Sequence, residues 1–162
     1  MIIKTGFLSG NLFFTTNLKN GAEMENRVDI IELTQGRQQI NLRPHHGMCL
    51  YFFEGKGYSD GFTKHMAQVK AWLEEPGEGH RITIVDRTDE ICSACPHNVD
   101  GVCETLDKVN RYDAGVLEYT GIRPGDTMTF AEFSRKVQDK ILTPGYGKRI
   151  CGDCGWRDIC HK

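Results

Sequence analysis

The cysteines of this chain constrain its fold more than any other feature of the sequence. Two CxxC pairs are each followed by a third cysteine after a short interval, as Cys92-x2-Cys95-x7-Cys103 and Cys151-x2-Cys154-x5-Cys160. A seventh cysteine, Cys49, stands alone behind two histidines. Paired thiolates from one turn are typical ligands of soft metal ions and clusters. The two triplets therefore predict segments that fold around metal.

A disulfide scaffold is the competing interpretation of the same cysteines. Secreted scaffolds of this kind usually carry an even number, and this chain has seven. Residues 1–23 also lack a secretory signal, since their apolar stretch is broken by Asn11 and followed by polar residues. We therefore expect a cytoplasmic protein, in which thiols stay reduced and clustered cysteines more often hold metal.

Composition excludes several classes of function. With 162 residues the chain is long enough for one domain with a real hydrophobic core. Its formal net charge of -2 gives no basic excess, so nucleic-acid binding has no electrostatic support. No apolar run approaches the roughly 18 residues that cross a bilayer. We expect neither a nucleic-acid partner nor a membrane partner.

The sequence divides into an N-terminal extension, residues 1–38, and a cysteine-rich metal-binding domain, residues 39–162. The first 23 residues lack helical or strand periodicity and precede a second methionine, Met24. One hypothesis is that translation begins at Met24. The other is that the extension is native and poorly ordered.

The first half of the domain predicts a strand–helix–strand unit. Residues 39–43 and 81–86 alternate polar and apolar side chains, as strands do, and Pro44 suits the first position of a helix. Ser59 is placed to cap a helix that runs to Leu73. A long helical crossover between the two strands allows them to pair in parallel.

The second half predicts helices. One runs from Glu104 to Tyr119 and stops at Gly121, and Thr129 with Glu132 forms a capping box for a last helix. Both cysteine triplets fall in segments without periodicity, which we expect to be loops. The predicted fold class is α+β, a compact single domain with two cysteine-bearing metal-binding loops. Three acidic residues of the first helix are interpreted as its solvated face: Asp107, Asp113 and Glu118.

The thiols are compatible with two kinds of metal centre, structural zinc and an iron–sulfur cluster. Structural zinc needs four ligands, and a histidine near each triplet offers the fourth, His97 or His161. An iron–sulfur cluster is larger and accepts more irregular ligand spacing, although the usual ferredoxin runs are absent. Seven thiols cannot complete two four-cysteine sites, so one site has a non-cysteine ligand or an open position.

Three segments together resemble a known family. LRPHHGMCLYFFEGKGYSDGF at 42–62, DEICSACPHNVDGVC at 89–103 and CGDCGWRDIC at 151–160 are similar to an uncharacterised family of small bacterial and archaeal proteins. Iron–sulfur binding has been suggested for that family from its cysteines. The resemblance covers about residues 40–160 and implies cofactor ligands at six positions, accompanied by Cys49, His45 and His46: Cys92, Cys95, Cys103, Cys151, Cys154 and Cys160.

The RPHHGMC segment leaves three alternatives open. In a helix, His45 is four residues and His46 three residues from Cys49, so either pair shares a face. In the first alternative Cys49 is a further metal ligand, and a histidine binds the metal too or orients the thiol. In the second it is a nucleophile activated by imidazole. In the third it is a buried free cysteine.

These observations favour an iron–sulfur protein, with a 4Fe-4S cluster as the expected cofactor. We expect it to transfer electrons or sense redox state for an unidentified protein partner. The alternative is an interaction module in which zinc supplies folding free energy without redox chemistry. A metalloenzyme with an incompletely ligated iron ranks behind both, and no catalytic residue is predicted.

Overall fold

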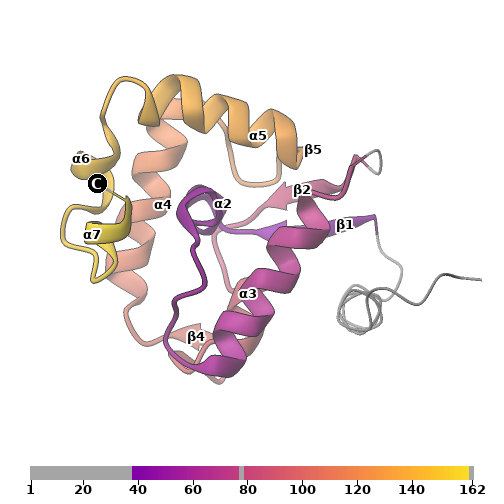
Figure 1. Cartoon of the computed structure of the whole chain (residues 1–162). Helices are drawn as coiled ribbons and strands as arrows, with labels where there is room; N and C mark the ends of the chain where they lie inside the picture. The colour runs from indigo at the N-terminus through magenta and orange to yellow at the C-terminus, as the bar shows by residue number, and fades with distance from the viewer. Residues whose placement is uncertain (1–37, 77–78, 161–162) are drawn as a thin grey trace, which may run out of the picture.

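The computed structural model of the protein describes residues 38–76 and 79–160, and our expectations for the N-terminal extension and for Met24 lie outside them. Within these residues the chain forms a small sheet, a short hairpin and a set of helices (Figure 1). The elements are β1 (Gln39–Leu42), α2 (Pro44–Phe52), α3 (Asp60–Leu73), β2 (Arg81–Ile84), the 3-10 turn η1 (Ile91–Ala94), β3 (Asn98–Val99), β4 (Val102–Cys103), α4 (Leu106–Thr120), β5 (Thr127–Thr129), α5 (Phe130–Val137), the π-helical turn η2 (Gln138–Leu142), α6 (Gly147–Cys151) and α7 (Arg157–Cys160).

The larger sheet has three strands in the order β1-β2-β5. β1 and β2 pair in parallel, with Leu42 opposite Ile84, and α2 and α3 form the connection between them. β5 pairs antiparallel with the other edge of β2. The predicted α+β class and the parallel pair are confirmed, whereas the short strand β5 was not predicted.

The helix ends follow the local signals in the sequence. Pro44 occupies the start of α2, and the Ser59 hydroxyl accepts a hydrogen bond of 3.1 Å from the backbone N–H of Phe62 at the start of α3. Gly121 ends α4 in the left-handed region, with φ of 70°. The capping box at the start of α5 is present in full. These predictions are confirmed.

Helix α2 lies at the centre of the molecule and positions the candidate site. It packs against α4, α5 and α7, so it connects the sheet to the C-terminal turns (Figure 1). Its apolar side chains join a core that includes the fully buried Leu50, Val116 and Phe133. The central position of α2 explains why His45 is buried and His46 is only partly exposed.

The two cysteine segments are more regular than the loops predicted for them. Cys92 lies in the 3-10 turn η1 and Cys103 in the strand β4, while Cys151 and Cys160 end the short helices α6 and α7. The short helical turns close hydrogen bonds over three or four residues and β4 pairs over two residues with β3, and such short elements show no periodic apolar pattern in the sequence.

Gly47 of α2 is required by close packing. A Cβ atom at this position would overlap the ring of Phe133. We expect Gly47→Ala to lower the free energy of unfolding by about 1–3 kcal/mol, as over-packing of a core does. Gly61→Ala in α3 is the matched control, because nothing lies near its Cβ position. Urea denaturation measures both, and equal stability of the two variants would contradict the packing.

Within the described residues, no helix is long and apolar enough to span a membrane.

Candidate metal centre

Four of the seven cysteines line one cavity between α2 and the C-terminal turns, and all seven are free thiols. The four are Cys49 of α2, Cys151 at the end of α6, Cys154 in the following turn and Cys160 at the end of α7. The cavity has a volume of about 130 Å³. A cavity of about 150 Å³ holds a benzene molecule. The space therefore suits a ligand larger than a single ion.

Local hydrogen bonds hold the C-terminal thiols in place. The backbone N–H of Cys154 donates to the carbonyl of Cys151 at 3.0 Å and closes the CxxC turn. Asp153, inside this turn, is tied to α4: its carboxylate accepts from the Tyr112 hydroxyl at 2.8 Å and its carbonyl from Lys108 at 2.9 Å. The turn is thus fixed to a long helix, and contact between α2 and α7 brings Cys49 to the same cavity.

The cavity wall is mostly apolar. Phe53, Phe62 and Met66 line it, with the Trp156 side chain from the C-terminal turns. The backbone N–H of Trp156 donates to the Cys154 sulfur at 3.4 Å. A wall of this kind limits water, and N–H donors to sulfur stabilise negative charge there.

The spacing of these thiols is wider than a single ion requires. Zinc bound by sulfur at about 2.3 Å in a tetrahedron holds its thiolates about 3.8 Å apart. In the part of the chain that the structure describes, no three of the four thiols lie within 4.8 Å of one another. A cluster binds each thiolate through a different iron, so its ligands stand farther apart.

Burial keeps the thiols of Cys49 and Cys151 protonated when no metal is bound. It raises the pKa of Cys49 well above its ordinary value, and the charges of Cys160, Cys151 and Cys154 add to the effect. Burial likewise raises the pKa of Cys151, to about 12. A cation that replaced the protons would relieve this cost. The raised pKa also disfavours Cys49 as an activated nucleophile.

The metal-free protein should lose stability at alkaline pH. Thiols of the unfolded chain titrate near pH 8.5, so above that pH the unfolded state binds fewer protons than the folded state, whose Cys49 and Cys151 have raised pKa values. The free energy of unfolding must then fall as the pH rises. We expect urea midpoints of the reduced, metal-free protein to decline from pH 8 to pH 10 or so. A constant or rising midpoint would contradict this.

Both histidines of the RPHHGMC segment are oriented by buried carboxylates. Nδ1 of His45 donates to Asp113 at 2.6 Å, and Nδ1 of His46 to Asp89 at 2.8 Å. Burial lowers the pKa of His45 to about 4, so its ring is neutral at pH 7. Both residues line the cavity. Metal-binding histidines commonly show such a carboxylate contact at one ring nitrogen, and in His45 it leaves Nε2 available.

The prediction that Asp113 lies on the solvated face of its helix is wrong. Asp113 is buried and forms an ion pair with Arg43 at 2.6 Å. Burial alone would raise the pKa of Asp113, but the hydrogen bonds and charge of His45 and the charge of Arg43 outweigh it and hold that pKa low. The sequence contains a signal for this, because Asp113 follows Val109 by four residues and precedes Val116 by three, on the apolar stripe of α4.

The middle triplet does not line the four-thiol cavity. The N–H of Cys95 donates to the Cys92 carbonyl at 3.1 Å, closing a second CxxC turn. Asp100 and Gly101, both with positive φ, then make a two-residue hairpin turn that carries Cys103 back on β4. None of the three lines the cavity. The structure thus groups four thiols and separates three.

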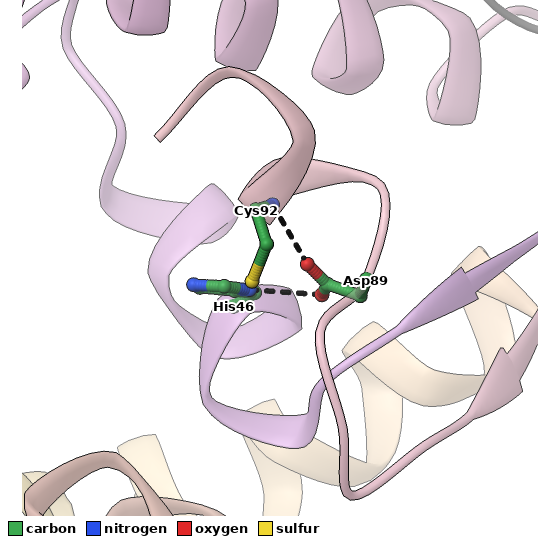
Figure 2. A group of neighbouring side chains, drawn as sticks. All are labelled: His46, Asp89 and Cys92. Carbon is green, nitrogen blue, oxygen red and sulfur yellow. Dashed lines mark hydrogen bonds and ion pairs between the residues drawn. The ribbon is translucent and has the colours of Figure 1, made fainter. Parts of the chain in front are cut away.

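Cys92 has a different set of neighbours. Ligating atoms of His46, Asp89 and Cys92 all lie within 4.8 Å of one another (Figure 2). The N–H of Cys92 also donates to the Asp89 carboxylate, at 3.0 Å. Asp89 precedes the triplet by three residues and opens the segment 89–103, but no ligand spacing in the sequence singled it out. His97, a possible fourth zinc ligand, is bonded through Nδ1 to Glu104 at 2.8 Å, and His161 lies outside the described residues.

A comparison with protein families finds one family whose sequence model matches the chain. The sequence model of DUF1284, a protein of unknown function, matches residues 57–160, more than half of the chain. The chain belongs to the DUF1284 family. This confirms the resemblance to an uncharacterised family. The matched residues contain both cysteine triplets, while Cys49 and the two histidines precede them. No curated protein and no solved structure matches the chain.

Proposed function

We propose that the four-thiol cavity binds a 4Fe-4S cluster through Cys49, Cys151, Cys154 and Cys160, and that the protein transfers electrons or senses redox state for a protein partner in the cytoplasm. The single observation that carries this proposal is the convergence of four thiols on one cavity, one from α2 and three from the C-terminal turns. The ligand set predicted from the sequence is thereby divided, with the middle triplet left outside the cluster.

The chemistry of the wall supports the proposal. A cluster with four thiolates carries negative charge, and Arg157 and Lys56 bring positive side chains to the cavity lining, Lys56 in an ion pair with Glu54 at 3.2 Å. The N–H of Trp156 already points at the Cys154 sulfur. Hydrogen bonds to sulfur, net charge and solvent exposure are the properties by which a protein sets a cluster potential.

Electron exchange requires that a partner can approach the site. When bound, a cluster of this type accepts and releases single electrons. Cys151 is buried, whereas Cys154 and Cys160 are only partly buried, so one side of the cavity lies close to the surface. The apolar wall formed by α2 and α3 closes the other side. This arrangement supports exchange with a docked protein and protection from bulk water.

Metal and sulfide analysis of anaerobically purified protein tests the proposal. We expect a brown protein with visible charge-transfer absorption that bleaches on reduction, and about four iron and four sulfide per chain. A colourless protein that carries zinc and no sulfide would contradict the cluster and favour the zinc-stabilised module.

A further inference from the structure

Three side chains that can bind metal, none of them one of the four cavity thiols, lie close together at α2. His46 comes from α2, while Asp89 and Cys92 come from the segment after β2. Their ligating atoms lie within 4.8 Å of one another, and this is the only such group of three among residues 38–76 and 79–160. The side chain of Asp89 is fully buried and that of His46 is 18% exposed. The three residues are therefore held in place by the fold.

We propose that His46, Asp89 and Cys92 bind one zinc ion, at a site that uses none of the four cavity thiols. Nitrogen, carboxylate oxygen and thiolate sulfur are the donors that zinc takes in proteins, whereas magnesium and calcium avoid sulfur. Donors around one zinc ion stand about 3.3–3.8 Å apart. The three ligating atoms already lie within 4.8 Å of one another, and the 2.8 Å between His46 Nδ1 and the Asp89 oxygen would widen slightly on binding. The inference holds whether or not the cavity takes a cluster.

The surroundings of Asp89 fix the geometry of the group. One carboxylate oxygen accepts from the N–H of Arg43 at 2.6 Å and from His46 Nδ1 at 2.8 Å, and the other accepts from the N–H of Cys92. A carboxylate has about four lone-pair positions. Zinc would take the place of the proton that now lies between Nδ1 and the carboxylate, so both backbone hydrogen bonds can remain.

A catalytic relay is a poorer interpretation of the same three residues. In a relay the carboxylate holds one ring nitrogen and the nucleophile contacts the other. Here the second nitrogen of His46 points away from both Asp89 and Cys92 (Figure 2). In addition, burial raises the pKa of Cys92 to about 12, with the charge of Asp89 adding to it, so the thiol is not activated.

Cys95 is the best-placed fourth ligand. It lies three residues after Cys92 in the same turn, as the second member of the CxxC pair. Zinc-binding CxxC turns supply both of their thiolates to one ion. Cys95 would thereby complete a four-coordinate site.

Cobalt titration tests the proposal, because cobalt bound by thiolate absorbs in the near ultraviolet and adopts zinc geometry. The titration is done under reducing conditions on metal-stripped protein carrying Cys151→Ala and Cys154→Ala, which remove the other site. We expect one equivalent of cobalt to bind and an excess of zinc to displace it. Adding Cys92→Ala should weaken binding at least about 100-fold, more than loss of an orienting contact does. His97→Ala is the control and should leave binding unchanged.

Alkylation of the wild-type chain gives a readout that does not depend on the folding of these variants. Zinc should slow modification of Cys92 by iodoacetamide at least about 10-fold, since a metal-bound thiolate is protected. Cys103 serves as the internal reference. No saturable binding in the titration, or equal modification rates for Cys92 with and without zinc, would overturn the proposal.

The same variants separate this site from the proposed cluster. In protein purified anaerobically, Cys92→Ala should lose zinc and keep iron and sulfide, whereas Cys154→Ala should lose iron and sulfide and keep zinc. Loss of iron and sulfide in Cys92→Ala would overturn the separate site. Absence of iron from the wild-type protein would overturn the cluster alone.

Discussion

Asp113→Asn should lower the free energy of unfolding by about 3–5 kcal/mol, the cost of leaving one partner of a buried ion pair uncompensated. Arg43 is 1% exposed, and its guanidinium donates from Nε to Asp113 at 2.8 Å. Asp113 also accepts from the N–H and the ring of His45. The substitution removes the charge that balances Arg43 and replaces one of the two accepting oxygens with an amide NH2 donor, so Arg43 and His45 can no longer both be accepted. Urea denaturation followed by circular dichroism measures the loss.

Asp107→Asn is the control for this prediction, since Asp107 lies in the first turn of the same helix and is exposed. Surface substitutions of this kind change stability by no more than about 0.5 kcal/mol. If Asp113→Asn lost less than about 1 kcal/mol, the Arg43 pair would have to be far better solvated than its burial implies.

Cys49→Ala should leave the purified protein nearly free of cluster. Cys49 is the one cavity thiol that α2 supplies, so its removal leaves one iron without a protein thiolate and opens it to solvent. We expect iron to fall from about four atoms per chain to below about one. Iron and sulfide analysis after anaerobic purification, with the visible spectrum, measures the change.

Cys103→Ala is the matched control, because Cys103 belongs to a triplet but does not line the cavity. It should retain wild-type iron and sulfide. The division of the seven thiols into four and three would be wrong if Cys103→Ala lost as much iron as Cys49→Ala.

The parts of the fold that depend on neighbouring residues were predictable from the sequence. Ser59 and the Thr129–Glu132 capping box mark helix starts by hydrogen bonds closed within four residues, and Pro44 marks one by its fixed φ. The structure contains each of them. The parallel pair followed from two alternating strands and the length of the crossover. β5 was missed because a strand of three residues is too short to show alternation.

The composition of the candidate site was only partly predictable. All four cavity thiols were predicted as metal ligands, but their grouping depends on contact between α2 and α7, which lie about a hundred residues apart in the chain. Arg43 and Asp89 gave no signal, because charged residues are usually exposed and their burial here follows from partners distant in sequence. Tertiary contacts, rather than local patterns, select these residues.

Anomalous diffraction at the iron edge, from crystals of anaerobically purified protein, tests the central claim most directly. We predict one compact iron peak in the cavity, within bonding distance of the sulfur atoms of Cys49, Cys151, Cys154 and Cys160. Iron bound at the middle triplet instead, or an ordered cavity whose four thiols carry no iron, would contradict the account.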